Sequence, residues 1–169
     1  MPVLQMPKTL HLAAARRAPR AFRFDSPVGS SRRAFETLPH GYLILDRDFT
    51  IVDVNPAYAR LTMTDPGLIL GRDIFDVFPD NPGDPLATGV KKLTASLKKV
   101  IEKAEQDTMP WQRYDIPDRT GIFVERHWDP TNCPILDDNG EVEFIVHHVA
   151  DVTNVAKRFL ASHRASSQE

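Results

Sequence analysis

Cysteine and long apolar stretches are the two features that this sequence most lacks. Among its 169 residues, Cys133 is the single cysteine, which excludes an internal disulfide bond and any zinc or iron–sulfur site built from four thiolates. No apolar run approaches the length of about 18 residues that a membrane-spanning helix needs, so we expect no membrane partner. Phosphate loops, serine nucleophile elbows and metal-binding helix motifs are also missing, and we expect that the protein is not an enzyme.

The composition is that of one ordinary globular domain with tails. Hydrophobic residues make up 41% and charged residues 26% of the chain, which is enough for a core of useful size. The charge is uneven, because residues 1–35 hold seven Lys or Arg against one Asp, whereas the whole chain has a net charge of −2. No aromatic and basic platform for stacking bases accompanies these charges, so a nucleic-acid partner is not expected. We interpret residues 1–30 as a disordered basic tail, solvated or folded back on the acidic body, and without a secretory signal we expect a cytoplasmic location.

The order of the expected elements favours an α+β fold. Two strands, "YLILD" and "TIVDVN", precede a helix that starts at Asn55 and Pro56, where Asn is a good cap and Pro suits the first helical position. Residues 65–87 are so rich in Pro, Gly and Asp that only single turns of helix are expected there. Three strands end the pattern: "MPWQRYDI", "GIFVERHWDPTNCPI" and, after a hairpin turn at "DDNG", "EVEFIVHHVADV". Strands grouped on either side of a helical block argue against a doubly wound parallel sheet.

A long amphipathic helix at residues 88–106 is the clearest single element. At about 100° per residue, its apolar side chains share one narrow arc, as expected for a surface helix that packs on a core. The arc holds Val90, Leu93, Leu97, Val100, Ile101 and Ala104. Lysines fill the opposite arc, and we interpret them as a solvated face rather than as an anion site.

Two adjacent histidines, His147 and His148, lie in the middle of the last strand. Because side chains alternate along a strand, the two imidazoles point to opposite faces, and both faces are largely apolar. A buried imidazole needs a hydrogen-bond partner. The preceding strand offers several, but the spacing alone leaves the register between the two strands open.

The chain resembles the PAS fold between about Leu38 and Asn154. The resemblance is carried by "GYLILDRDFTIVDVNPAYARLT", by "GRDIFDVFPDNPGDPLATGV", which resembles a subgroup found in bacterial sensor proteins, and by "CPILDDNGEVEFIVHHVADVTN". It implies a five-stranded antiparallel sheet with helices on one face, enclosing a small-molecule pocket. The expected domain then spans residues 31–154, with a flanking helix at 31–38, and residues 155–169 form a helical extension that frays.

The resemblance also implies which strand residues face the pocket. The residue two before Asp151 usually points inward, so Val149 and His147 point inward with it, and His148 lies on the outer face. The candidate ligand-binding residues are Trp128, Asn132, His147, Val149, Arg113, Tyr58, Phe75, Phe78, Leu93, Leu97 and Ile101. An alternative interpretation is that His147 is a structural histidine whose hydrogen bond is satisfied by Asn132 or a backbone carbonyl. For Arg113 the alternative is a surface cation beside Asp115.

The cofactor stays unknown at this stage. Haem-binding PAS domains usually carry their histidine on the long helix, which has none here, so haem is disfavoured. Photoactive flavin members carry a reactive cysteine in the irregular helical segment, whereas Cys133 alternates outward; non-covalent flavin remains possible. The adjacent histidines point in opposite directions and cannot share one ion, and we expect no metal site.

The resemblance implies a stand-alone sensory or interaction module without a catalytic output domain. We expect a homodimer, or a signalling partner such as a histidine kinase or a regulator, with Asp151 and Thr153 passing the signal into the last helix, which Thr153 is placed to cap. Two alternatives remain: a small α+β enzyme that uses His147 as a general base, and a dimerisation scaffold that binds no ligand.

Overall fold

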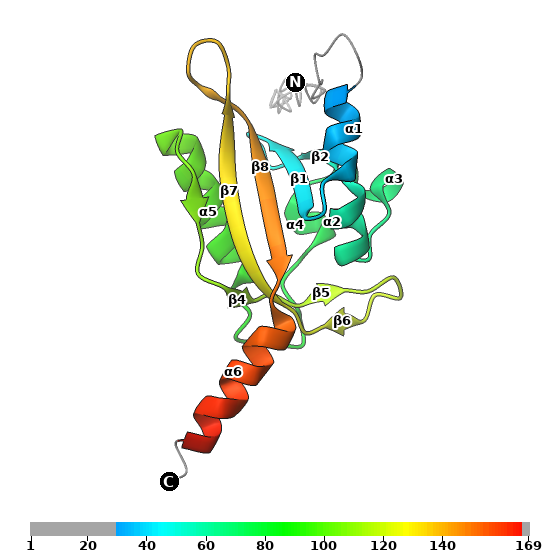
Figure 1. Cartoon of the computed structure of the whole chain (residues 1–169), viewed down its shortest axis with the longest axis vertical. Helices are drawn as coiled ribbons and strands as arrows, with labels where there is room; N and C mark the ends of the chain where they lie inside the picture. Colours follow the sequence, from blue (N-terminus) through cyan, green and yellow to red (C-terminus); the bar gives the residue numbers. More distant parts are fainter. Residues whose placement is uncertain (1–29, 167–169) are drawn as a thin grey trace, which may run out of the picture.

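The computed structural model describes residues 30–166 of the chain (Figure 1). The expected basic tail, residues 1–30, therefore lies outside the described residues apart from Ser30, with which the first helix begins. Within the described part, none of the helices is both long enough and apolar enough to cross a membrane.

An antiparallel sheet forms the centre of the molecule. Its strands are β1 (Gly41–Asp46), β2 (Ile51–Val54), β3 (Asp107–Thr108), β4 (Gln112–Arg113), β7 (His127–Leu136) and β8 (Val142–Asp151). The strand order is β2-β1-β8-β7-β3, and β4 also pairs with β7. The expected α+β class and antiparallel sheet are thus confirmed. Of the strand expected at "MPWQRYDI", residues 109–116, β4 forms in the middle and Ile116 begins β5 (Ile116–Pro117), which makes a separate small hairpin with β6 (Phe123–Val124), whereas β3 lies just before the expected strand.

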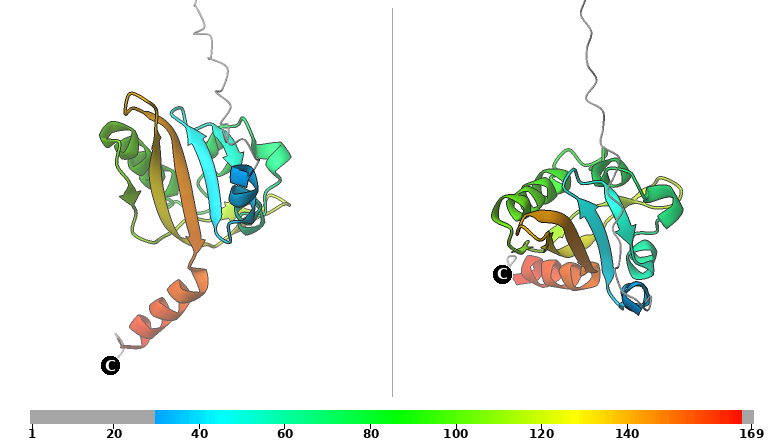
Figure 2. Two further views of the ribbon diagram at one scale, coloured as in Figure 1. Left: turned by 45° about the horizontal axis from the view of Figure 1, so that its top comes forward. Right: turned by 90° about the horizontal axis from the view of Figure 1, so that it is seen from above.

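Most helices cover one face of this sheet (Figures 1 and 2). The covering helices are α2 (Pro56–Leu61), α3 (Pro66–Ile69), α4 (Ile74–Val77) and α5 (Gly89–Lys103). The Asn55 side chain accepts a hydrogen bond from the Tyr58 backbone N–H at 2.9 Å, so the expected cap is present. The single turns expected in residues 65–87 are α3 and α4, each started by an aspartate whose carboxylate accepts a backbone N–H.

Two apolar clusters lie on the two faces of the sheet. The larger is on the helix-covered face, where Leu43, Leu45 and Ile145 of the sheet are fully buried with Leu97 and Val100 of α5. On the other face, Phe35 from α1 (Ser30–Thr37) packs with Ile44 and Phe144. The flanking helix expected at residues 31–38 therefore forms a small second core on the outer face.

The last helix, α6 (Thr153–Ser166), begins directly after β8 and extends away from the sheet (Figure 1). Near its start Ala156 is fully buried, whereas Phe159 is about half exposed and lies against the ring of Trp111, with 5.9 Å between the ring centroids. Only the first turns of α6 are therefore held by the domain.

Candidate ligand site

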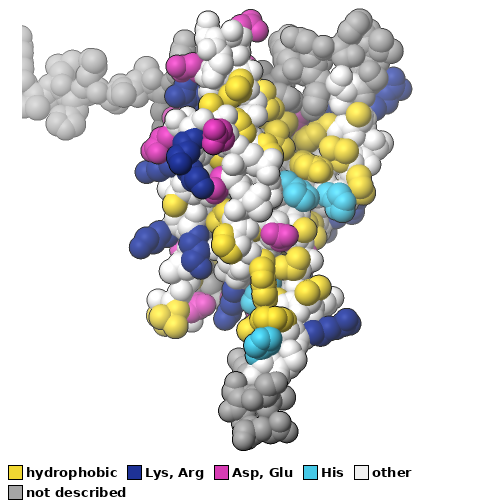
Figure 3. Space-filling view, turned by 60° about the vertical axis from the view of Figure 1, so that its left-hand side comes forward, with side chains coloured by type: hydrophobic (Ala, Val, Ile, Leu, Met, Phe, Trp, Pro, Cys, Tyr) yellow, Lys and Arg dark blue, Asp and Glu magenta, His cyan; other side chains and the backbone are white. Residues whose placement is uncertain are grey.

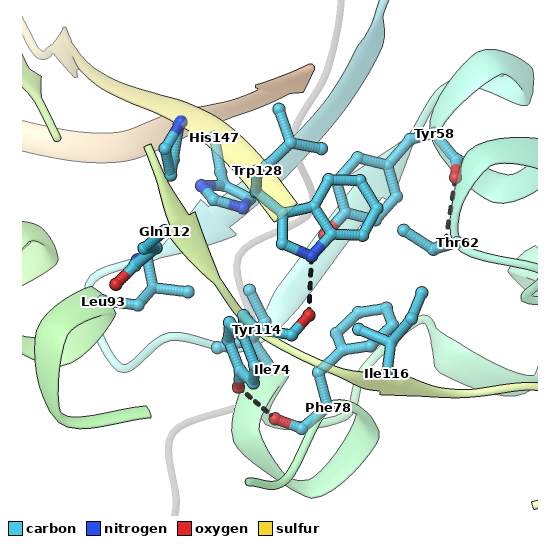
Figure 4. A pocket seen from close by; sticks show the side chains of 12 residues that line it. Tyr58, Thr62, Ile74, Phe78, Leu93, Gln112, Tyr114, Ile116, Trp128 and His147 are labelled. Atoms are coloured by element: carbon cyan, nitrogen blue, oxygen red, sulfur yellow. Dashed lines mark hydrogen bonds between the residues drawn. The ribbon is translucent and has the colours of Figure 1, made fainter. Parts of the chain in front are cut away.

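A small cavity of about 40 Å³ lies between the sheet, α4 and the start of α5 (Figure 4). Its wall is mainly apolar and aromatic. The lining residues are Tyr58, Thr62, Ile74, Phe78, Leu93, Gln112, Tyr114, Ile116, Trp128, Pro130, His147 and Val149. A cavity needs roughly 10–15 Å³ to hold one water molecule, so this space admits a few heavy atoms without rearrangement.

His147 is a deeply buried titratable group of the cavity wall. Its side chain is 3% exposed, and its Nδ1 lies 2.7 Å from Oδ1 of Asn132. Burial, with a smaller contribution from the charge of His148, lowers the pKa of His147 to about 3. The imidazole is therefore neutral at ordinary pH.

Asn132 begins a chain of hydrogen bonds that runs from His147 to the surface. Its Nδ2 donates to Oγ of Ser96 on α5 at 2.8 Å, and the Ser96 hydroxyl donates to Asp107 at 2.6 Å. Asp107 also forms an ion pair with Lys99. The hydrogen bonds from Lys99 and then from Ser96 lower the pKa of Asp107, which keeps it ionised. We call the series His147, Asn132, Ser96, Asp107 and Lys99 the polar relay.

Three other donors of the cavity wall bind backbone carbonyls. Trp128 Nε1 donates to the carbonyl of Tyr114 at 2.7 Å, Thr62 Oγ1 donates to the carbonyl of Tyr58 at 2.9 Å, and the Tyr114 hydroxyl donates to the carbonyl of Phe78 (Figure 4). Burial raises the pKa of both Tyr58 and Tyr114, so both phenols stay protonated. These three hydrogen bonds hold the aromatic rings of the wall in place.

Gly89 allows one of these rings to approach α5 closely. A Cβ atom at this position would lie 2.5 Å from Cγ of Tyr114, a distance that forces a shift. The N-terminus of α5 can therefore lie directly against the Tyr114 ring only because residue 89 has no side chain.

Six of the candidate residues from the sequence line the cavity. They are Tyr58, Phe78, Leu93, Trp128, His147 and Val149. Asn132 is fully buried but lies behind His147, and Phe75, Leu97 and Ile101 pack in the core without reaching the cavity. Arg113 is on the surface, where it pairs with Asp115 and Asp84. The strand register puts Asn132 opposite His147 and Pro130 opposite Val149, as the PAS resemblance implies.

Six lining residues were not among the candidates: Thr62, Ile74, Gln112, Tyr114, Ile116 and Pro130. Gln112 and Tyr114 lie in and just after the two-residue strand β4. The one sequence signal for an inward direction of these side chains was their alternation with the half-exposed Trp111. A strand as short as β4 is too short to show a clear alternation.

The Cys133 side chain points away from the cavity. It lies opposite Val146 on the outer face of the sheet, where its Sγ is 3.4 Å from Oε1 of Gln106. In addition, no group of three or more His, Cys, Asp or Glu side chains within residues 30–166 could hold a metal ion.

The residues around the cavity do not fit a flavin or a haem. An apolar cavity of about 150 Å³ is known to hold one benzene ring. The cavity here has about 40 Å³, whereas a flavin has three fused rings and a haem is larger still. Either group would require the wall to repack.

The outer face of the sheet carries the second histidine. His148 is partly buried, its Nδ1 lies 2.9 Å from the carbonyl of Gly41, and its ring stacks on Tyr42 with centroids 4.7 Å apart. The ring of His40 is 5.8 Å away. In Figure 3, hydrophobic side chains run along the middle of this side of the molecule, and Lys and Arg side chains gather at its α5 edge.

The junction of β8 and α6 differs from the expected cap. The carboxylate of Asp151 accepts the backbone N–H of Thr153 at 2.9 Å, so the aspartate caps the helix. The Thr153 hydroxyl oxygen instead accepts the buried backbone N–H of His127 at 2.9 Å, and the His127 carbonyl accepts from Val152 at 2.9 Å. The start of β7, the end of β8 and the start of α6 are therefore tied at one point.

A profile of the PAS fold matches residues 35–157. The chain belongs to the PAS family. PAS domains are in general sensory modules without catalysis of their own. No curated protein is detectably similar to this chain.

Solved PAS structures share the fold at low sequence identity. A PAS domain from Colwellia psychrerythraea is 16% identical, with a TM-score of 0.58 over 74% of this chain and 96% of that one. An RNA-binding light-oxygen-voltage receptor is 20% identical, with a TM-score of 0.63 over 99% of this chain and 42% of that one. The VqmA dimer of Vibrio cholerae is 21% identical, with a TM-score of 0.53 over 75% of this chain and 52% of that one.

Proposed function

We propose that this PAS domain is a sensory module that binds a small molecule in its core cavity. The observation that carries the proposal is the buried cavity itself, which has a neutral imidazole in an otherwise apolar and aromatic wall. A wall of this kind, with a few placed polar groups, is typical of small-molecule sites. VqmA, which shares the fold, has been solved bound to DPO.

Strand β8 connects the cavity to the helix that would carry the signal. His147 and Val149 line the cavity, and Asp151, at the end of the same strand, caps α6. A ligand that prefers one packing of β8 over another would bias the direction of α6 by its differential affinity for the two states. We assign Asp151 and Thr153 to this transmission.

Catalysis by His147 is disfavoured. An efficient general base at neutral pH has a pKa near 7. Burial lowers the pKa of His147 to about 3, so its basicity is far too low for that role. In place of an enzyme, we propose a cytoplasmic receptor that signals by a change in assembly.

The assembly that we propose is a homodimer formed through the outer face of the sheet. Around His148, the partly exposed side chains of Val146, Ile135 and Tyr42 leave an apolar surface beside the small cluster under α1. A signalling partner such as a histidine kinase or a regulator is the alternative occupant of the same face.

A ligand screen followed by thermal melting tests the cavity. A ligand that binds only the folded state raises the melting temperature. We expect that Val149→Phe, which fills the cavity, abolishes this shift, whereas Val146→Phe on the outer face of the same strand retains it. If no compound in a broad fragment set shifts the melting temperature of the wild-type protein, ligand sensing is refuted and the scaffold alternative stands.

Sedimentation velocity tests the dimer. We expect the wild-type chain to sediment as a dimer and Val146→Glu as a folded monomer, because a buried carboxylate without a partner is costly. Lys98→Glu, on the solvated face of α5, is the control and should leave the mass unchanged. A wild-type protein that sediments as a monomer at all concentrations would contradict the dimer.

A further inference from the structure

The polar relay fixes which atom of His147 carries the proton. The ammonium of Lys99 can only donate, and the carboxylate of Asp107 accepts from it and from the Ser96 hydroxyl. Ser96 has then used its one proton and must accept from Nδ2 of Asn132. This leaves Oδ1 of Asn132 toward His147, so Nδ1 of His147 is the donor in the 2.7 Å contact.

The consequence is an open acceptor in the cavity wall. With Nδ1 protonated and the ring neutral, Nε2 of His147 bears a lone pair. None of the residues from 30 to 166 forms a hydrogen bond with this nitrogen, although the side chain is 3% exposed and lines the cavity (Figure 4). An unpaired acceptor on a buried side chain that faces a cavity favours a ligand that brings a donor.

The rest of the wall offers no charge for an anion. None of the lining residues is a lysine or an arginine, and the donors of Trp128, Thr62 and Tyr114 are already bound to backbone carbonyls. The Tyr58 hydroxyl forms no hydrogen bond within the described chain and can pair with a ligand as donor or acceptor. A carboxylate or phosphate placed here would be buried without a counter-charge.

Gln112 shows where the cavity can open. This side chain is 9% exposed, its Oε1 is buried without a hydrogen-bond partner, and it lines both the cavity and two outer grooves of about 520 and 380 Å³. Because Oε1 has no hydrogen bond to lose, a movement of the Gln112 side chain toward the grooves breaks no hydrogen bond of that atom. The cavity can thus admit one small ring without breaking the polar relay.

We infer that the cavity selects small, uncharged molecules that donate a hydrogen bond to Nε2 of His147, and that the polar relay sets this choice. This ligand class rests on the proposed function of ligand sensing. Within the relay, Asn132, Ser96 and Asp107 are positioning residues, since they act on the ligand only through the tautomer of His147.

The first experiment measures the tautomer directly by 15N NMR of the imidazole. Near neutral pH we expect Nδ1 of His147 to carry the proton and Nε2 to be bare. A proton on Nε2 would overturn the inference whatever the protein binds. Ser96→Ala should release the Asn132 amide to rotate and give a mixture of tautomers, whereas Thr94→Ala removes a hydroxyl from the same helix outside the relay and should leave the spectrum unchanged.

The second experiment compares matched probes: pyrrole with furan, and phenol with toluene and benzoate. In titrations of the wild-type protein, we expect pyrrole and phenol to bind about five- to tenfold more tightly than furan and toluene, and benzoate not to bind. In Ser96→Ala this preference should fall toward equality. Equal binding of the donor and non-donor probes, or preferred binding of benzoate, would refute this inference alone. Absence of binding by every probe and by the broad fragment set would refute ligand sensing itself.

Discussion

His147 and His148 are neighbours in the chain and yet belong to two different parts of the molecule. His147 lies on the helix-covered face, is held by Asn132 and borders a cavity, whereas His148 lies on the outer face and stacks on Tyr42 over the carbonyl of Gly41. The two imidazoles are one residue apart, yet strand alternation gives them different surroundings. The first is neutral and buried beside the cavity, and the second lies at a surface that we assign to a partner. In the function that we propose, the inner face serves recognition and the outer face serves assembly, and this division can be tested face by face.

The largest difference in stability between the two faces is expected when an apolar side chain is shortened to alanine. Ile145 on the inner face is fully buried, so Ile145→Ala should lower the free energy of unfolding by about 2–5 kcal/mol. Val146 on the outer face is partly exposed, and Val146→Ala should cost less than about 1 kcal/mol. Urea denaturation of both variants at one protein concentration measures the two values. Equal losses would show that the two faces are packed alike.

The second difference between the faces is the pH dependence of stability. In the unfolded chain a histidine has a pKa near 6.5, whereas burial lowers the pKa of His147 to about 3 in the folded protein. The unfolded state therefore binds the extra proton first, and stability is lost as the pH falls below about 6.5. Between about pH 7.5 and pH 5 we expect a loss of about 2 kcal/mol from this group.

Denaturation curves across that range, with two variants, assign the loss. His147→Gln should have a flatter dependence of stability on pH than the wild-type protein. His148→Gln keeps His147 buried and should retain the dependence, because burial contributes more to the lowered pKa than the neighbouring charge does. A loss that persists unchanged in His147→Gln would show that another group is responsible.

A smaller loss is expected at the junction where both faces end. Thr153→Val removes the acceptor of the buried His127 N–H, which should cost about 1–2 kcal/mol. Thr37→Val, at the exposed end of α1, serves as the control and should change stability by less than about 0.5 kcal/mol. Hydrogen exchange should show faster exchange in the first turn of α6 in Thr153→Val alone. Unchanged protection there would mean that Thr153 does not hold the helix.

The smallest loss of stability is expected when the exposed ion pair at one end of β1 and β8 is broken. Arg47 and Glu141 are 3.3 Å apart, and their side chains are 51% and 68% exposed. Arg47→Ala should lower the free energy of unfolding by less than about 0.5 kcal/mol, and added salt should remove the difference. A larger loss in thermal denaturation would indicate that the hairpin between β7 and β8 contributes more to the fold than its exposure suggests.

Strand alternation and local motifs predicted those parts of the site that lie on regular elements. Alternation put His147 and Val149 on one face of the strand, and the PAS resemblance implied that this face points inward. The Leu93 face of α5 follows from the helical period that the sequence displays. Gln112 and Tyr114 could not be found in this way, since β4 has two residues and its position depends on pairing with β7. The function of Thr153 was also misjudged, because its hydroxyl binds a backbone group of His127, which is distant in the sequence.

The attachment of α6 through its first two turns has a mechanical consequence. Thr153, Asp151 and the backbone of His127 act together as a pivot, and the 14 residues of α6 extend from it by about 20 Å at about 1.5 Å per residue. A tilt of about 10° at this pivot would displace the far end of such a rod by about 3–4 Å. Under the proposed function, the helix would work as a lever that converts a small shift at the end of β8 into a movement of a few ångströms at its far end.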